Sequence, residues 1–205
     1  KAIKKEVSTP ISIDTYKPKV AEKAIESGAS IVNDVTGLRD IEMRKVVKQA
    51  TCPAIVMHML GNPKTMQENP FYPNGVIKDL LSFFQQRIAE LLDFGIEKKQ
   101  IILDPGIGFG KSVQDNLEIV SSINAFKKLG HEVLIGASRK SFLGKLLKKT
   151  PDQLLPATLA IHTINLLGGV DYIRVHDAKE HKEMIDFVKS LEKINGYNTQ
   201  SYTNM

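Results

Sequence analysis

Six stretches of strand length, rich in aliphatic and β-branched residues, each end at a polar side chain that can bind or react. They are Pro10–Asp14, Ala29–Asp34, Ala54–Met59, Gln100–Asp104, Glu132–Ser138 and Asp171–Asp177. Nearly continuous apolar runs are typical of parallel strands that are covered on both faces. Helical patterns separate the runs, so the sequence predicts repeated βα units in an α/β fold.

Polar side chains follow all of these predicted strands. Because parallel strands end at the same edge of a sheet, and loops at that edge build ligand sites, we expect these side chains to meet in one pocket. They are Asp14, Asn33, His58, Asp104, Ser138, Lys140, Arg174 and His176.

The composition limits the class of protein. A chain of 205 residues, 42% hydrophobic and 25% charged, suits one globular domain. Its single cysteine, Cys52, excludes an internal disulfide and fits a reducing compartment. The net charge of +5 is spread over helix faces rather than clustered with aromatic residues, which favours a small anionic substrate over nucleic acid. No apolar stretch approaches the ~20 residues that span a bilayer, so no membrane partner is expected.

Capping patterns mark several helices. Pro18 and Gly28 bound one helix, and Ser112 with Asp115 forms a capping box for a helix predicted to run through Leu129. Val76–Phe94 is amphipathic along its whole length. Leu60–Gly75, with three prolines and two glycines, is predicted to be a flexible connection over the pocket mouth.

Six βα units are fewer than the eight that close a barrel. The first residues resemble the end of a preceding helix, so the sheet is either open or preceded by two further βα units, and we favour the second. The sequence therefore predicts that residues 1–194 form strands 3 to 8 of a (β/α)8 TIM barrel. Residues 195–205 have no hydrophobic pattern and are predicted to be a disordered tail.

The densest motif is DPGIGFGKS at Asp104–Ser112. It is not a Walker A loop, because Gly106 and Gly110 enclose three residues where that loop needs four. What remains is a carboxylate held at a strand end, which can cap a turn or bind a ligand. Together, Asp14, Asn33 and Asp104 suit a flat heterocycle such as a pterin or guanine, whose paired N–H donors match a carboxylate.

Cationic groups lie at the carboxyl ends of the last two predicted strands. Lys140 is a surface lysine, an anion contact or a Schiff-base amine. Arg174 and His176 alternate along the last run, so both are predicted to point to one side, with Val175 opposite. They suit a phosphate or diphosphate, or a buried structural salt bridge.

Several motifs together resemble the dihydropteroate synthase family. These are SIDTYKP, NDVTG, MHMLGNPKTMQ, LDPGIGFGK, GASRKSFLG and YIRVHD, and the resemblance extends to about Leu191. It implies a pterin-binding (β/α)8 barrel that condenses 6-hydroxymethyl-7,8-dihydropterin diphosphate with p-aminobenzoate, with the assistance of Mg²⁺, and releases 7,8-dihydropteroate and diphosphate. It also implies inhibition by sulfonamides. The family's first two strands have no counterpart in this sequence.

The resemblance also implies roles for individual residues. Pterin binding is implied for Asp14, Asn33, Met57, Asp104 and Lys140, diphosphate binding for Arg174 and His176, p-aminobenzoate binding for Phe109, Ser138 and Lys140, and catalysis for Lys140, Asp104, Arg174 and His176. No metal ligand is expected in this fragment, because the family's asparagine for Mg²⁺ belongs to the part without a counterpart. The resemblance also implies a cytoplasmic homodimer. In some members of the family, a pyrophosphokinase domain is fused upstream.

Three alternatives stay open at this point. A methyltetrahydrofolate-dependent methyltransferase would share the aspartates and Asn33 but would not need Ser138–Lys140 or Arg174–His176. A Schiff-base aldolase would use Lys140. A barrel without catalytic activity could serve as an interaction module.

Overall fold

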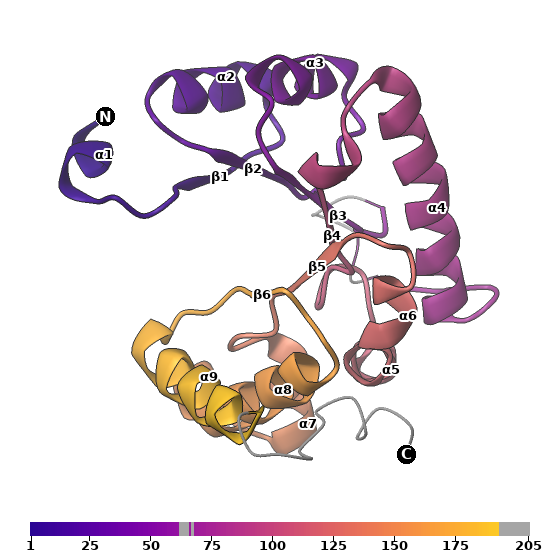
Figure 1. Cartoon of the computed structure of the whole chain (residues 1–205). Helices are drawn as coiled ribbons and strands as arrows, with labels where there is room; N and C mark the ends of the chain where they lie inside the picture. Colours follow the sequence, from indigo (N-terminus) through magenta and orange to yellow (C-terminus); the bar gives the residue numbers. More distant parts are fainter. Residues whose placement is uncertain (62–65, 67, 193–205) are drawn as a thin grey trace.

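The computed structural model describes residues 1–61, 66 and 68–192. A single parallel sheet carries six strands in the order β1 to β6, and each strand pairs in parallel with the next along the chain. The strands are β1 (Ser12–Asp14), β2 (Ile31–Asp34), β3 (Ala54–Met57), β4 (Ile101–Asp104), β5 (Glu132–Ile135) and β6 (Tyr172–Ile173). The sheet curls, and every helix drawn after the first lies on its outer side (Figure 1), as expected for part of an α/β barrel.

Helices separate the strands, so the predicted βα repeat is confirmed. The helices are α1 (Ala2–Glu6), α2 (Pro18–Glu26), α3 (Ile41–Ala50), α4 (Val76–Phe94), α5 (Val113–Ser121), α6 (Ile123–Lys127), α7 (Ser141–Leu147), α8 (Leu155–Leu167) and α9 (Ala178–Glu192), with 3-10 turns at Lys98–Gln100 and Pro151–Gln153. Figure 1 shows α2 and α3 over one end of the sheet and α7, α8 and α9 over the other, with α4 to α6 between them. No helix in the described part of the chain has the length and apolar character that a membrane crossing requires.

The caps read from the sequence form as predicted, with one exception. Pro18 occupies the first turn of α2, and Ser112 and Asp115 cap each other's backbone N–H groups at the start of α5. The helix predicted to continue through Leu129 instead breaks at Ser122, between α5 and α6. The Ser121 hydroxyl donates to the carbonyl of Glu118 at 2.9 Å, and such side-chain bonds to the backbone weaken a helix locally.

The two faces of the sheet pack differently. Residues such as Val56, Leu103 and Ile135 point outward into the main core beneath the helices. The opposite, inner face carries a small separate cluster of Ile55, Ile102 and Leu134, with Ile31 packed against it. Because side chains alternate along a strand, the residues two positions later share this inner face.

The inner face therefore gains polar side chains, Asp14, Asn33 and Asp104, at the carboxyl ends of the strands. Two residues beyond Ser12, Ile31, Ile55, Ile102 and Leu134 stand Asp14, Asn33, Met57, Asp104 and Gly136. The strand register places Asp14 beside Asn33 and Met57 beside Asp104. The fold thus collects these side chains in one layer above the inner apolar cluster.

All six strands are shorter than the predicted runs, and three of them end before the carboxyl end of their run. Strand β3 ends at Met57, β5 ends at Ile135, and β6 contains only Tyr172–Ile173. Strand β6 pairs with one described neighbour only, β5, which limits its length. Arg174, Val175 and His176 consequently follow the strand instead of alternating along it.

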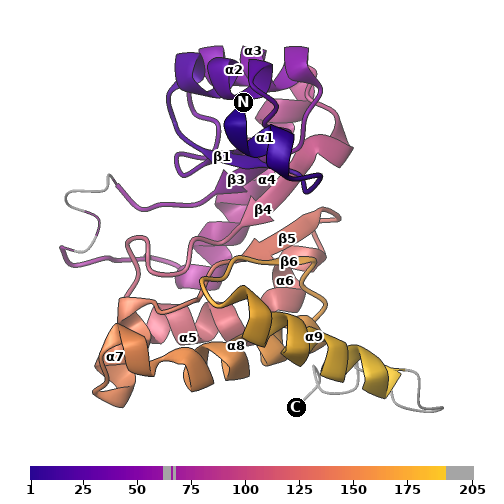
Figure 2. The same cartoon turned by 90° about the vertical axis from the view of Figure 1, so that its left-hand side faces the viewer.

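The connection from β3 to α4 leaves the carboxyl-terminal end of the sheet, on the left in Figure 2. Residues 62–65 and 67 of the predicted flexible connection Leu60–Gly75 lie outside the described residues, and so does the whole predicted tail, 195–205. These two predictions are therefore not tested.

Candidate binding site at the carboxyl ends of the strands

A cavity of about 300 Å³ lies at the carboxyl ends of the strands. It is lined by Met57, Asp104, Gly106, Ile107, Phe109, Gly136, Ser138, Lys140, Arg174, Val175 and His176. The ends of β3 and β4 and the segments that follow β4, β5 and β6 contribute to this lining. Five of the eight residues predicted to meet in one pocket line it, whereas Asp14, Asn33 and His58 do not. The volume is at the lower end of the range of small-molecule sites in proteins.

Asp104 is a buried carboxyl group in this cavity. Its Oδ1 accepts a hydrogen bond of 2.8 Å from the Gly106 N–H, and no described residue donates to Oδ2. Burial raises the pKa of Asp104 to about 6, against the opposing effects of the Gly106 bond and the positive charges of Lys140 and Lys111. Gly106 has φ +71, and a Cβ there would lie 2.0 Å from the His58 carbonyl oxygen, so the turn requires glycine.

The burial of Asp104 predicts a pH-dependent stability. The pKa of Asp104 in the folded chain, about 6, lies above the usual 3.8. Between these two values the folded chain therefore binds more protons than the unfolded chain. Its free energy of unfolding should fall as pH rises from about 4 to about 6. Chemical denaturation of the wild type and of Asp104→Asn across this range measures the effect. If the free energy of unfolding of the wild type falls no more steeply with pH than that of Asp104→Asn, the raised pKa of Asp104 is contradicted.

Asn33 and Asp34 are adjacent but face opposite sides of β2. The Asn33 side chain is buried, and its Oδ1 lacks a hydrogen-bond partner in the described structure. Such an orphaned acceptor costs about 1–3 kcal/mol, which a ligand N–H can recover. The Asp34 carboxylate accepts bonds from the Thr36 N–H, the Thr36 hydroxyl and the Leu38 N–H, so it holds its own loop.

Lys140 extends across the cavity from the segment after β5. Its Nζ lies 4.2 Å from the centre of the Phe109 ring, within the range of a cation–π contact. A Cβ at Gly108 would come within 3.2 Å of Lys140 Cδ, so the glycine leaves room for the lysine. Burial lowers the pKa of Lys140, and the nearby Asp104 carboxylate opposes this shift.

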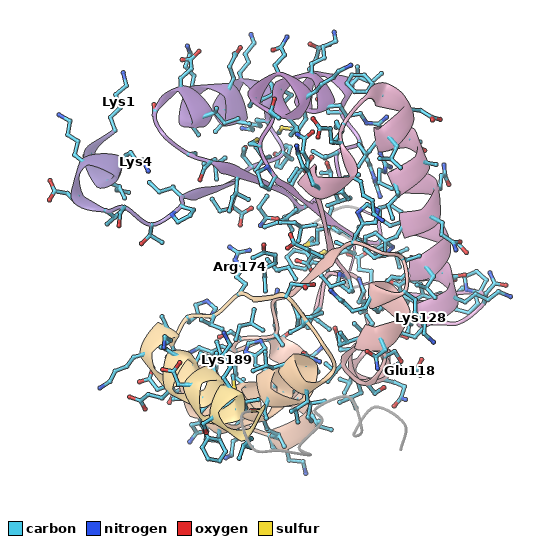
Figure 3. The ribbon with its side chains drawn as sticks, in the orientation of Figure 1. Lys1, Lys4, Glu118, Lys128, Arg174 and Lys189 are labelled. Atoms are coloured by element: carbon cyan, nitrogen blue, oxygen red, sulfur yellow. The ribbon has the colours of Figure 1, made fainter. Side chains whose placement is uncertain are left out.

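Arg174 reaches from the segment after β6 toward the end of β1. Its Nη2 lies 2.7 Å from the Asp14 Oδ2, and both side chains are about half exposed, at 58% and 46%. Figure 3 shows Arg174 inside the curl of the sheet. This ion pair brings Asp14 to the site, although Asp14 itself does not line the cavity. It is an exposed pair and not the buried salt bridge considered from the sequence.

His176 and Ser138 form a second polar pair. The His176 N–H donates to Ser138 Oγ at 3.2 Å, and the same hydroxyl lies 2.9 Å from His176 Nδ1. The hydroxyl can accept from the backbone and still bind Nδ1 as donor or as acceptor, so this contact fixes the position of the ring in either tautomer. Val175 also lines the cavity, so the prediction that it lies opposite Arg174 and His176 was wrong.

His58 does not line the cavity, so its predicted place in the pocket was wrong. Because β3 ends at Met57, His58 turns away and packs edge-on against Phe83. Its Nδ1 lies 3.1 Å from Lys111 Nζ, and burial, with the charges of Lys111 and Arg39, lowers the pKa of His58 to about 3.

Lys111 is a buried group that sequence reasoning missed. Its Nζ donates to the Phe109 carbonyl at 3.1 Å as well as contacting His58. Burial lowers the pKa of Lys111 to about 7. The GFGK motif contains this lysine, but from the sequence we compared the motif only with a Walker A loop and gave the lysine no role. Through its bond to the Phe109 carbonyl, Lys111 therefore helps to hold the loop that carries Phe109.

Comparisons with known proteins identify relatives of this chain. Residues 1–176 match the family model described as pterin binding enzyme. The dihydropteroate synthase of Haemophilus influenzae is 39% identical over 175 residues, which are 85% of this chain and 63% of the relative. This chain thus spans less than two thirds of the length of that relative.

Solved structures give the same picture. A dihydropteroate synthase from Yersinia pestis, solved with a sulfonamide drug complex, superposes with a TM-score of 0.89 at 32% identity, covering 93% of this chain and 69% of that one. The enzyme from Thermus thermophilus in complex with 6HMPPP has a TM-score of 0.84 at 36% identity, covering 90% and 73%. A second complex of the Thermus enzyme contains 4-aminobenzoate.

Proposed function

Because this chain belongs to the family of pterin-binding enzymes, we propose that the whole protein is a dihydropteroate synthase. It would condense 6-hydroxymethyl-7,8-dihydropterin diphosphate with p-aminobenzoate and release 7,8-dihydropteroate and diphosphate. The observation that carries the proposal is the buried Asp104 carboxylate, which shares one cavity with Lys140, Arg174 and His176. In this proposal the six strands are strands 3 to 8 of a (β/α)8 barrel, and two further strands fill the space between β6 and β1.

The pterin would lie with its 2-amino-pyrimidinone edge against Asp104. That edge presents two parallel N–H donors, which an ionised carboxylate accepts in pairs. The orphaned Asn33 Oδ1 and the position of Asp14 beside it support a polar edge for the rest of the ring. Met57 lines the cavity beside Asp104 and would pack on the ring.

The diphosphate would lie against Arg174 and His176. Departure of diphosphate from the methylene group places developing negative charge on oxygen, and a guanidinium and an imidazole N–H stabilise it electrostatically. Arg174 must leave Asp14 to do so, which the exposure of the pair allows. The nucleophile is the aryl amine of p-aminobenzoate, so no covalent bond to the protein is needed.

The p-aminobenzoate would lie near Phe109, Ser138 and Lys140. Phe109 offers a ring for stacking, Ser138 a hydroxyl, and Lys140 a charge for a carboxylate or for the diphosphate. In this proposal a sulfonamide occupies the same place, and p-aminobenzoate relieves the inhibition.

Among the described residues, no group of three or more His, Cys, Asp or Glu side chains is placed to hold a metal ion. We propose that Mg²⁺ binds with the diphosphate substrate and with residues outside this chain. No step of the mechanism above depends on it.

We further propose a cytoplasmic homodimer. Cys52 is buried and unpaired, which suits a reducing compartment. The adjacent helices α8 and α9 expose Ile164 and Phe187, at 53% and 65%, and these offer apolar surface for a second copy. Sedimentation of the full-length protein tests the dimer.

The proposed function is tested by assaying the full-length protein with the pterin diphosphate, p-aminobenzoate and Mg²⁺. We expect 7,8-dihydropteroate and diphosphate in equal amounts, and inhibition by a sulfonamide that excess p-aminobenzoate relieves. A protein that binds the pterin but forms no dihydropteroate would contradict the proposal.

Lys140→Ala should lower turnover and weaken p-aminobenzoate binding without unfolding the protein. The lysine touches Phe109 and approaches Asp104, and removing one charge contact to a bound ligand costs about 1.5–3 kcal/mol, or roughly 10- to 100-fold in affinity. The matched control is Lys145→Ala, which removes an exposed lysine on the neighbouring helix and should leave both parameters unchanged.

Lys140 is also predicted to form no covalent intermediate, because neither substrate has an aldehyde or ketone carbonyl that could form a Schiff base with an amine. Borohydride treatment during turnover, followed by mass spectrometry, measures this directly. A reduced adduct on Lys140 would contradict the proposal and favour a Schiff-base aldolase.

A further inference from the structure

Two buried histidines lie outside the cavity, on adjacent helices. His162 on α8 is 0% exposed and His181 on α9 is 1% exposed. His162 Nδ1 lies 2.8 Å from His181 Nε2, and the two rings meet edge to face. The mechanism described above does not use either residue.

The hydrogen bonds around the pair run in one direction. The Ala137 N–H donates to His162 Nε2 at 3.4 Å, so a neutral His162 carries its hydrogen on Nδ1 and donates it to His181 Nε2. His181 Nδ1 then donates to the Asp177 carbonyl at 2.7 Å. Every ring nitrogen has a partner only when both rings are neutral and both carry hydrogen on Nδ1. Burial, and then the neighbouring His181, lowers the pKa of His162 to about 4, which agrees with a neutral ring.

Both ends of this hydrogen-bond chain are backbone groups of segments that line the cavity. Ala137 precedes Ser138 after β5, and Asp177 follows His176 after β6. The Arg139 guanidinium pairs with the Asp177 carboxylate, Nε lying 3.0 Å from Oδ2, and this closes a ring back to Ala137. Ser138 lies between Ala137 and Arg139 in this ring, and its contact His176 directly precedes Asp177.

We propose that His162 and His181 are positioning residues, which fix the segment after β5 against the segment after β6. In this way they set the geometry of Ser138 and Lys140 relative to Arg174 and His176. Two apolar side chains in place of the histidines would fill the same space. They would, however, leave the Ala137 N–H without its acceptor and would remove the hydrogen-bonded link between the two segments that runs through α8 and α9. The catalytic consequence rests on the proposed function, whereas the hydrogen-bond chain does not.

Nitrogen-15 NMR of the histidine rings in the full-length protein tests the hydrogen-bond chain without any assay of activity. We expect two neutral rings at pH 7, each with its hydrogen on Nδ1, and loss of the His181 signature in His162→Leu. A charged ring, or a hydrogen on Nε2 of either residue, would overturn the proposal.

Kinetics and binding test the positioning role. His162→Leu should raise the KM for p-aminobenzoate and the Kd for inorganic diphosphate about 10-fold or more, because small displacements of substrate-holding groups carry large penalties. The Kd for a pterin without diphosphate should stay within about 2-fold, since Asp104 and Asn33 lie on other strands. His162→Gln, whose amide can accept from Ala137 and donate to His181, should restore most of the loss.

The matched control is His131→Leu, which removes another buried histidine, just before β5 at the opposite end of that strand. It should lower stability without changing diphosphate affinity. If His162→Leu lowers only the melting temperature, or if His131→Leu changes diphosphate affinity equally, the pair is packing alone and the proposal is wrong. If the protein has no synthase activity, the NMR and diphosphate measurements still decide the question.

Discussion

Asp104→Asn in the full-length protein is expected to nearly abolish pterin binding and, at the same time, to stabilise the ligand-free fold. An ionised carboxylate accepts two parallel N–H donors, whereas an asparagine amide turns one of these contacts into N–H facing N–H. A mismatched polar group in a buried site costs about 1–3 kcal/mol, and more when a charged acceptor is lost. We therefore expect pterin affinity to fall by at least about 100-fold.

The gain in stability has a separate origin. Above pH 6 the folded chain must keep the buried Asp104 ionised, although burial has raised the pKa of its carboxyl group to about 6 from the usual 3.8. This difference corresponds to about 3 kcal/mol, which the neutral asparagine does not incur. The asparagine Oδ1 can still accept from the Gly106 N–H, as the aspartate does at 2.8 Å. The ionised Asp104 carboxylate is thus expected to bind the substrate and to lower the stability of the ligand-free fold.

Calorimetric titration with a pterin and chemical denaturation at pH 7 measure the two effects. Asp34→Asn is the matched control, because Asp34 is buried at the end of β2, two strands away from Asp104, and accepts its bonds from Thr36 and Leu38. It should lower stability and change pterin affinity far less. Unchanged affinity in Asp104→Asn would contradict the assignment of Asp104.

Arg174→Ala is expected to weaken the binding of the pterin diphosphate and of inorganic diphosphate by roughly 10- to 100-fold, and to leave free pterin almost unaffected. Hydrogen bonds between charged groups contribute about 1.5–3 kcal/mol, and Arg174 extends from the end of β6 into the curl of the sheet. Calorimetry with the three ligands separates these effects.

The ion pair with Asp14 supplies the control for Arg174. In Asp14→Asn the guanidinium loses its carboxylate partner, which lies 2.7 Å away in the structure. Inorganic diphosphate should then bind as tightly as in the wild type, or more tightly. If Asp14→Asn and Arg174→Ala weaken diphosphate binding equally, Arg174 is a structural residue that acts through the ion pair.

The sheet and most of the site could be predicted because both follow from local sequence patterns. Apolar runs fix the strands, and alternation along a strand with parallel pairing then places Asn33, Met57 and Asp104 on one face. The caps at Pro18 and Ser112 follow from backbone chemistry within one turn, and so they formed as predicted.

The remaining features depend on contacts between distant segments, which a single sequence does not reveal. His58 was misplaced because β3 ends at Met57, two residues before the end of its predicted run, and that end is set by pairing with β4. The His162–His181 pair joins two helices that are separated by β6, and the buried position of Lys111 depends on β3. Neither follows from a local pattern.

The most direct test of the account is a crystal structure of the full-length protein with 6-hydroxymethylpterin diphosphate. We predict that the ring edge donates two hydrogen bonds to the Asp104 carboxylate, and that the diphosphate contacts Arg174 and His176. A larger hollow of about 660 Å³ lies outside the sheet, lined by residues of α2 and α3. A ligand bound in that hollow, or a ring held in the cavity without contact to Asp104, would contradict the central claim.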